Sequence, residues 1–190
     1  MKATIFDGSR TDDHFLADIQ SAVVSALSTN GWETESLTLR DMKITHCVGC
    51  FQCATTTPGL CRFDDGGRTV AKKFIQSDLV VFLSPVTFGG YSSQLKKAVD
   101  RMICLISPFF TKVKGETHHK KRYDRYPRLL AVGVLSVADE SGGDIFTKLL
   151  ERNAINMHSP AHEALVVSRD QSVDAIGAQI QPLFSRLGIS

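Results

Sequence analysis

Residues 79–90 read LVVFLSPVTFGG. Five consecutive apolar residues, 79–83, predict a strand that is buried on both faces, as at the centre of a parallel sheet. A proline and two glycines follow, and they predict a turn whose backbone can approach a planar ring closely. The apolar period then changes to that of a helix over residues 92–106. This order of strand, turn and helix predicts one βαβ unit of an α/β fold.

The same alternation continues on both sides of this stretch. Further strands are expected at residues 2–7, 32–39, 129–135 and 163–168. The first helix is expected to begin at a cap formed by Thr11 or Asp12 and to stop at Asn30-Gly31. Other helices are expected at about 68–77, at 144–156 and from about 171 onward.

The turn after the first strand distinguishes two open-sheet folds. A dinucleotide-binding fold requires Gly-x-Gly-x-x-Gly there, whereas residues 8–14 read GSRTDDH and contain one glycine. We therefore predict a flavodoxin-like three-layer α/β sandwich whose five-stranded parallel sheet has the order 2-1-3-4-5. A length of 190 residues fits one domain, 1–190, with a cysteine-rich loop at about 41–66 and a long loop at about 107–127.

Composition excludes several classes of protein. The formal net charge is +2 and no run of five like charges occurs, so neither a nucleic-acid surface nor an acidic tail is expected. No apolar run approaches the roughly eighteen residues of a membrane span. The charged turn that begins at Asp7 interrupts the amino-terminal apolar residues, so we expect no signal peptide and a reducing, cytoplasmic location.

Four of the five cysteines are crowded into fifteen residues, as Cys47-x-x-Cys50-x-x-Cys53 and then Cys61. Thiolates at this density suit a soft metal or an iron-sulfur cluster better than a hydrophobic core. A four-iron, four-sulfur (4Fe-4S) cluster, a zinc ion and free regulatory thiols all stay open on the residues alone. Cys104 lies among apolar helix residues and is expected to be a small buried hydrophobe.

Ligands of a parallel sheet bind at the edge where the strands' carboxyl ends meet. The turn at Gly8 opens a helix, and backbone amides with polar side chains there suit a phosphate, although a simple helix cap has the same composition. The candidate phosphate residues are Ser9, Arg10, Thr11 and His14. The turn after the central strand suits a planar isoalloxazine ring, and the turn after the fourth strand adds a hydroxyl. The candidates there are Pro85, Val86, Thr87, Phe88, Gly89 and Ser136.

These motifs carry a family resemblance over most of residues 1–135. The chain resembles the flavodoxin-like NAD(P)H-dependent FMN reductases, and most closely the iron-sulfur flavoproteins among them. The residues that carry it are Gly8-Ser9-Arg10, the cysteines with Gly59 and Asp64-Asp65, Ser84 to Gly89, Leu95-Lys96 and Asp100-Arg101. Asp12-Asp13-His14 departs from the family, which has a small Asn-Thr-like pair there; acidic side chains pointing inward would repel a phosphate.

The resemblance implies an FMN-dependent oxidoreductase in which the flavin carries the hydride or electron chemistry and no protein residue acts as a catalytic acid or base. It implies a 4Fe-4S cluster held by Cys47, Cys50, Cys53 and Cys61. NAD(P)H or a carrier such as ferredoxin would reduce the flavin, and a quinone or another small-molecule acceptor would oxidise it. It further implies a homodimer or homotetramer, with no nucleic-acid or membrane partner.

Other functions are compatible with the residues. One is a cluster-free NAD(P)H:quinone or FMN reductase; others are a flavodoxin-type electron carrier and a redox-sensing module without flavin. Electron carriers of that kind tend to be strongly acidic, and the charge of +2 argues against one. The basic stretch at 118–122 is interpreted as a solvated loop, or as a site for the phosphate of a nicotinamide cofactor or for a partner subunit. Asp100-Arg101 is expected to pair with a neighbouring element or to lie at a dimer interface.

Overall fold

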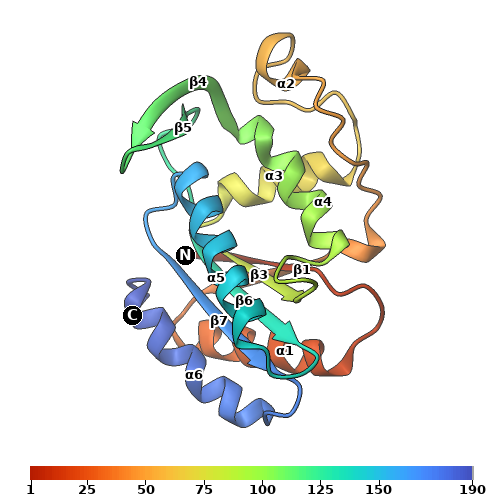
Figure 1. Ribbon diagram of the computed structural model, residues 1–190, viewed down its shortest axis with the longest axis vertical. Coiled ribbons are helices and arrows are strands. Elements are labelled where there is room, and N and C mark those ends of the chain that lie inside the picture. The colour runs from red at the N-terminus through yellow and green to blue at the C-terminus, as the bar shows by residue number, and fades with distance from the viewer. Residues whose placement is uncertain (190) are drawn as a thin grey trace.

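The computed structural model describes residues 1–189, and its centre is a parallel sheet with helices on both faces (Figure 1). The five strands have the order β2-β1-β3-β6-β7. Their bounds are Lys2–Asp7 (β1), Glu33–Thr38 (β2), Leu79–Pro85 (β3), Arg128–Leu135 (β6) and His162–Ser168 (β7). The predicted order 2-1-3-4-5 is confirmed, because the two remaining strands, β4 and β5, form a separate sheet.

Two helical layers cover the sheet, as Figure 1 shows, with α1 and α6 on one side and α3 and α4 on the other. The main helices are α1 (His14–Thr29), α3 (Gly66–Gln76), α4 (Ser93–Arg101), α5 (Glu140–Asn156) and α6 (Val173–Arg186). A four-residue helix, α2 (Gln52–Thr55), lies in the cysteine-rich segment, and 3-10 turns cover Leu39–Asp41 and Met102–Leu105. The predicted three-layer sandwich is therefore confirmed.

Strand β3 shows why the sequence folds in this way. Leu79 and Val81 pack into the core shared with α1 and α6, whereas Val80 and Phe82 pack into the core shared with α3, α4 and α5. Successive side chains of a strand point to opposite faces, so a continuous apolar run is needed where both faces are covered. The first six residues of β3 are all buried.

Residues 107–127, expected to be a long loop, contain an antiparallel hairpin instead. Strands β4 (Ile106–Val113) and β5 (Glu116–Lys121) pair through Val113 and Glu116. The two residues between them, Lys114 and Gly115, both have positive φ, the geometry of a tight two-residue hairpin turn. The sequence signal was weak because lysine is unusual in the first position of that turn.

Two helix ends also differ from the expectation. Asp13, rather than Thr11 or Asp12, caps α1, because its side chain accepts a hydrogen bond from the backbone N–H of Leu16, three residues on. The helix expected to reach residue 106 ends at Arg101 and tightens into a 3-10 turn. Within residues 1–189, no helix combines the length and apolar character needed to cross a bilayer.

Candidate functional site

The turns after β1 and β3 and the end of β6 lie at one edge of the sheet. The N–H of Gly8 donates to the carbonyl of Leu83 at 2.8 Å, and the N–H of Val86 donates to the carbonyl of Val134 at 2.8 Å. Strand β3 therefore joins the first turn to the end of β6, where Ser136 follows. The structure brings the segments that carry the predicted FMN residues to one edge, which is where parallel sheets bind ligands.

The first turn is closed by an arginine that the sequence analysis did not select. Arg40 Nη1 donates to the Ser9 hydroxyl at 2.5 Å, and Arg40 Nη2 donates to Asp12 at 2.6 Å. The Ser9 hydroxyl in turn donates to Asp7 at 3.0 Å. Ser9, His14 and Arg40 line a groove of about 280 Å³, whereas Arg10 and Thr11 are exposed and do not line it. The sequence did contain one signal for Arg40, because it is a positively charged residue just after β2, the strand that pairs with β1.

The two acidic residues of this turn are both compensated. Asp12 pairs with Arg40, and Asp13 forms an ion pair with Arg169 as well as capping α1. Burial opposes ionisation of Asp13, but hydrogen bonds from Arg169 and from the N–H of Leu16 outweigh it and lower the pKa of this carboxyl. The Asp13 carboxylate thus occupies the helix N-terminus that the sequence analysis assigned to a phosphate.

The turn after β3 presents an aromatic ring. The N–H groups of Thr87 and Gly90 each donate to the other's carbonyl, at 3.0 and 2.9 Å. Between them, Phe88 and Gly89 have φ values of 51° and 72°. A positive φ is strained for a bulky residue, and such strain concentrates at binding sites. Phe88 and Thr87 are exposed, Gly89 is buried, and Pro85 and Val86 are half-buried.

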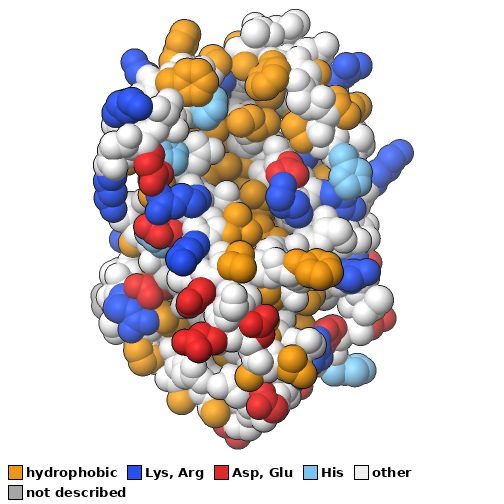
Figure 2. Space-filling view, in the orientation of Figure 1, with side chains coloured by type: hydrophobic (Ala, Val, Ile, Leu, Met, Phe, Trp, Pro, Cys, Tyr) orange, Lys and Arg blue, Asp and Glu red, His pale blue; other side chains and the backbone are white. Residues whose placement is uncertain are grey.

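A second site lies in the cysteine-rich segment, where a cavity of about 350 Å³ is lined by all four predicted ligands, Cys47, Cys50, Cys53 and Cys61. All four are free thiols. Burial raises the pKa of Cys53, and the negative charges of Cys61, Cys47 and Cys50 raise it further. Figure 2 shows hydrophobic side chains at the end of the molecule that carries α2 and β4, where Val48, Phe51, Phe109 and Phe110 are exposed.

The four thiols line the same cavity, but they do not surround a common metal-binding point. Among residues 1–189, no three His, Cys, Asp or Glu side chains are gathered closely enough to hold a single metal ion. A zinc ion needs four donors about 2.3 Å from one centre. Cys104 lies outside the lining of the cavity; its burial raises its pKa to about 11, as expected of an inert core thiol.

A buried ion pair lies beside this cavity. Arg101, which lines the cavity, is 1% exposed, and its guanidinium donates to both oxygens of Asp65, at 2.9 and 3.0 Å. The same guanidinium donates to the carbonyls of Thr45 at 2.7 Å and Phe63 at 3.3 Å. The pairing with another element, expected for Asp100-Arg101, is found for Arg101, whereas Asp100 pairs with Lys96 of the same helix. The burial of Arg101 could have been predicted from its position, since a residue three positions after the buried Ala98 lies on the core face of α4.

The Asp65 pair predicts acid sensitivity. Burial disfavours the charged carboxyl, but hydrogen bonds from Arg101, Thr45 and Gly67 outweigh it and hold the pKa of Asp65 well below its usual range. A lowered folded-state pKa stabilises the fold above the unfolded value of about 3.9 and loses that contribution at lower pH. We expect the free energy of unfolding to fall more steeply below pH 4 in the native chain than in Asp65→Asn, as measured by urea unfolding at pH 6, 4 and 3. Parallel pH curves for the two proteins would contradict this.

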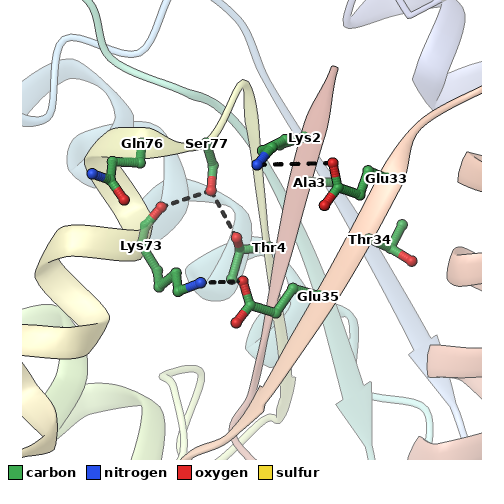
Figure 3. Close-up of a pocket in the computed structure, with 9 residues that line it drawn as sticks. All are labelled: Lys2, Ala3, Thr4, Glu33, Thr34, Glu35, Lys73, Gln76 and Ser77. Atoms are coloured by element: carbon green, nitrogen blue, oxygen red, sulfur yellow. Dashed lines mark hydrogen bonds and ion pairs between the residues drawn. The ribbon is translucent and has the colours of Figure 1, made fainter.

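The pocket at the opposite end of the sheet is separate from both sites, whereas the basic hairpin borders the cysteine segment. Phe110 and His119 of the hairpin line a small cavity of about 120 Å³ together with Cys53. His119 Nδ1 lies 2.7 Å from the carbonyl of Ser107, and His118 pairs with Glu116. Figure 3 shows another pocket, of about 400 Å³, at the amino-terminal ends of β1 and β2. Its charges are paired within the pocket, Lys73 with Glu35 at 2.6 Å and Lys2 with Glu33 at 3.8 Å, and the strands' carboxyl ends lie at the other edge.

Comparison with known proteins gives consistent results. The profile of the family described as NADPH-dependent FMN reductase matches residues 1–172. An iron-sulfur flavoprotein of Methanocaldococcus jannaschii is 33% identical over 101 residues, 53% of this chain and 51% of the relative. One of Archaeoglobus fulgidus is 29% identical over 103 residues, 54% of this chain and 46% of that protein. The matches therefore span about half the length of these curated relatives.

Solved structures share the fold. An NAD(P)H:quinone oxidoreductase from Methanothermobacter marburgensis superimposes with a TM-score of 0.72 at 14% identity, covering 98% of this chain and 94% of the other. An FMN-dependent NADH-azoreductase from Bacillus anthracis, solved in complex with FMN, has a TM-score of 0.69 at 14% identity and covers 98% of each chain. At this level of identity, the likeness establishes the fold.

Proposed function

Because the chain belongs to the NADPH-dependent FMN reductase family, we propose that it is an FMN-dependent oxidoreductase that receives electrons from NAD(P)H or from a reduced carrier such as ferredoxin. The observation that carries the proposal is the family match over residues 1–172, which includes the edge where the turns after β1, β3 and β6 meet. When bound, the flavin supplies the hydride and electron chemistry, so the protein residues bind, orient and shield it.

We place the FMN phosphate at the first turn and its ring at the turn after β3. Ser9, Arg10, Thr11 and His14 would hold the phosphate, and Arg40 adds a second guanidinium that already contacts Ser9. Pro85, Val86, Thr87, Phe88 and Gly89, with Ser136, would hold the ring. Phosphate binding at Ser9 would have to compete with Asp7, Asp12 and Asp13, so we expect Arg40 to be needed to offset these charges.

We further propose that Cys47, Cys50, Cys53 and Cys61 hold a 4Fe-4S cluster. Four thiols lining one cavity are the donor set that such a cluster uses. The names of the curated relatives, iron-sulfur flavoproteins, support the same assignment. The cluster would relay single electrons between the flavin and a partner.

A homodimer or homotetramer in the cytoplasm completes the proposal. Phe88, Val137 and Ile145 are exposed apolar residues near the proposed flavin edge, and a second subunit that covers them would shield the ring from water. A quinone or an azo compound is the class of acceptor suggested by the structural neighbours. A cluster-free reductase is the alternative, and it is favoured by the finding that, among residues 1–189, no three His, Cys, Asp or Glu side chains form a group that could hold a metal ion.

Anaerobic purification with quantification of FMN, iron and acid-labile sulfide tests the proposal. We expect about one FMN and about four iron and four sulfide per chain. A protein that contains FMN but neither iron nor sulfide, and that cannot be reconstituted with them, would be the cluster-free reductase. A colourless protein that does not take up FMN would overturn the flavin assignment.

A glycine substitution tests the position of the ring. A Cβ atom on Gly89 would lie 2.6 Å from Ile145 Cγ2, and its φ is +72°, so Gly89→Val must displace the turn after β3. We expect the dissociation constant for FMN to rise by about tenfold or more, equivalent to about 1.4 kcal/mol, in a fluorescence titration. Gly115→Val is the matched control, since Gly115 also has positive φ but has no atom within 4 Å of its Cβ position. Equal loss in both variants would contradict the assignment.

A further inference from the structure

The cysteine cavity is lined by two arginines in different environments. Arg62 is exposed to solvent, whereas Arg101 is 1% exposed. Burying a guanidinium is costly unless good geometry and further hydrogen bonds compensate. Even so, the Nε atom of Arg101 is buried without a hydrogen-bond partner. Asp65 and two backbone carbonyls offset the cost of burial, so a positive charge is kept out of water beside the four thiols.

The contacts of Arg101 fix the chain on both sides of the cysteine segment. One guanidinium nitrogen donates to the carbonyl of Thr45, two residues before Cys47, and the other donates to the carbonyl of Phe63, two residues after Cys61. Between these points only the four-residue helix α2 supplies regular secondary structure. Arg101 therefore holds the entry and the exit of a segment that has few internal restraints.

The two members of the ion pair are placed differently relative to the cavity. The Asp65 carboxylate accepts from the N–H of Thr45 at 2.8 Å and from the N–H of Gly67 at 2.9 Å, and it does not line the cavity. Arg101 does line it. The positive member of the pair is thus the one that faces the thiols.

Gly67 leaves the space that this arrangement needs. A Cβ atom on Gly67 would lie 2.8 Å from Arg101 Cζ, so any larger residue at the start of α3 would push the guanidinium away. The sequence Asp65-Gly66-Gly67 therefore provides both the counter-charge and the room for Arg101.

We propose that Arg101 is a positioning residue that clamps the cysteine segment and, through its buried charge, raises the reduction potential of the cluster held by the four cysteines. This inference rests on the proposed function, because it requires the cluster. Reduction adds one electron, and therefore one negative charge, to the cluster. A buried cation nearby stabilises that added charge more than a solvated one, since interior charges are poorly screened.

An anaerobic redox titration of the holoprotein tests this, with dithionite as the electron source and the visible spectrum as the readout. For Arg101→Gln we expect the ratio of reduced to oxidised cluster at a fixed potential to fall about tenfold, equivalent to about 59 mV for one electron. Arg101→Lys keeps the charge and is expected to restore most of the potential. Arg62→Gln removes a solvated charge from the same cavity and is expected to change the ratio less than about twofold.

A double variant addresses the possibility that Arg101→Gln misfolds because Asp65 is left buried and unpaired. Asp65→Asn combined with Arg101→Gln leaves no unpaired buried charge, and it is expected to shift the potential in the same direction by a smaller amount. Loss of iron from Arg101→Gln with retention in Arg101→Lys would also support the clamp. The inference would be overturned if Arg101→Gln and the double variant both kept their full iron content and an unchanged potential. It would also be overturned if Arg62→Gln shifted the potential as much as Arg101→Gln. Either result would leave the proposed function intact. Absence of iron and sulfide from the native protein would instead refute the cluster.

Discussion

Replacing Asp65 with alanine is expected to lower the free energy of unfolding by about 3–5 kcal/mol, because the change leaves Arg101 as an uncompensated buried charge. Asp65 and Arg101 have side chains that are 7% and 1% exposed. The substitution also removes the cap of α3, where the Asp65 side chain accepts from the N–H of Gly67, and loss of a cap costs about 1 kcal/mol by itself. Equilibrium unfolding in urea at neutral pH, followed by circular dichroism, measures the difference.

The adjacent residue is a matched control. Asp64 is also paired with an arginine, Arg68 at 3.1 Å, but its side chain is 84% exposed. Exposed ion pairs contribute about 0–1 kcal/mol, so Asp64→Ala is expected to change the stability by no more than that. Similar losses in Asp64→Ala and Asp65→Ala would show that the Asp65 pair is not the buried anchor of this region.

Replacing Cys53 with serine is expected to reduce the iron and sulfide content of anaerobically purified protein by about tenfold, because a cluster requires four thiolates. Cys53 is the buried member of the set and lies on α2, the helix within the cysteine segment. FMN content is expected to stay near that of the native protein, because the proposed flavin edge lies at the turns after β1 and β3. Colorimetric iron and sulfide assays, with flavin absorbance for normalisation, provide the measurement.

Cys104→Ala is the control for this substitution. Cys104 is buried, but it lies in the core beside Arg101, where its thiol donates to the Arg101 carbonyl at 3.3 Å. The variant is expected to keep its iron. Normal iron in Cys53→Ser, or equal loss in Cys104→Ala, would contradict the proposed ligand set.

Much of the fold followed from apolar periodicity. The run at 79–83 has side chains on both faces of the sheet, and only a central strand accommodates that pattern, so the central position of β3 was predictable. The strand order followed from the turn after the first strand, which lacks the glycines of a dinucleotide-binding fold. The hairpin at 106–121 was not predictable in the same way. Its strands are largely exposed and carry polar residues, so they lack the apolar alternation that identifies a buried strand.

The candidate sites divide in a similar way. The spacing of the four cysteines identified their segment, because thiols this close in sequence lie within reach of one cavity. Arg40 was missed because its partners Ser9 and Asp7 lie more than thirty residues away, across the pairing of β1 with β2. The role of Arg101 depends on Asp65 in the same way, at a separation of 36 residues.

The sequence by itself determined the sheet, its strand order and the grouping of the thiols, because these followed from local patterns: the apolar runs, the single glycine of the first turn and the close spacing of the cysteines. Only the tertiary structure decided which charges are buried and which groups they face. Asp13 became a helix cap, Arg40 closed the first turn, and Arg101 came to lie beside the cysteine cavity. The physical reason is that the energy of a charge depends on the solvent and partners around it, and folding assembles that environment from distant parts of the chain.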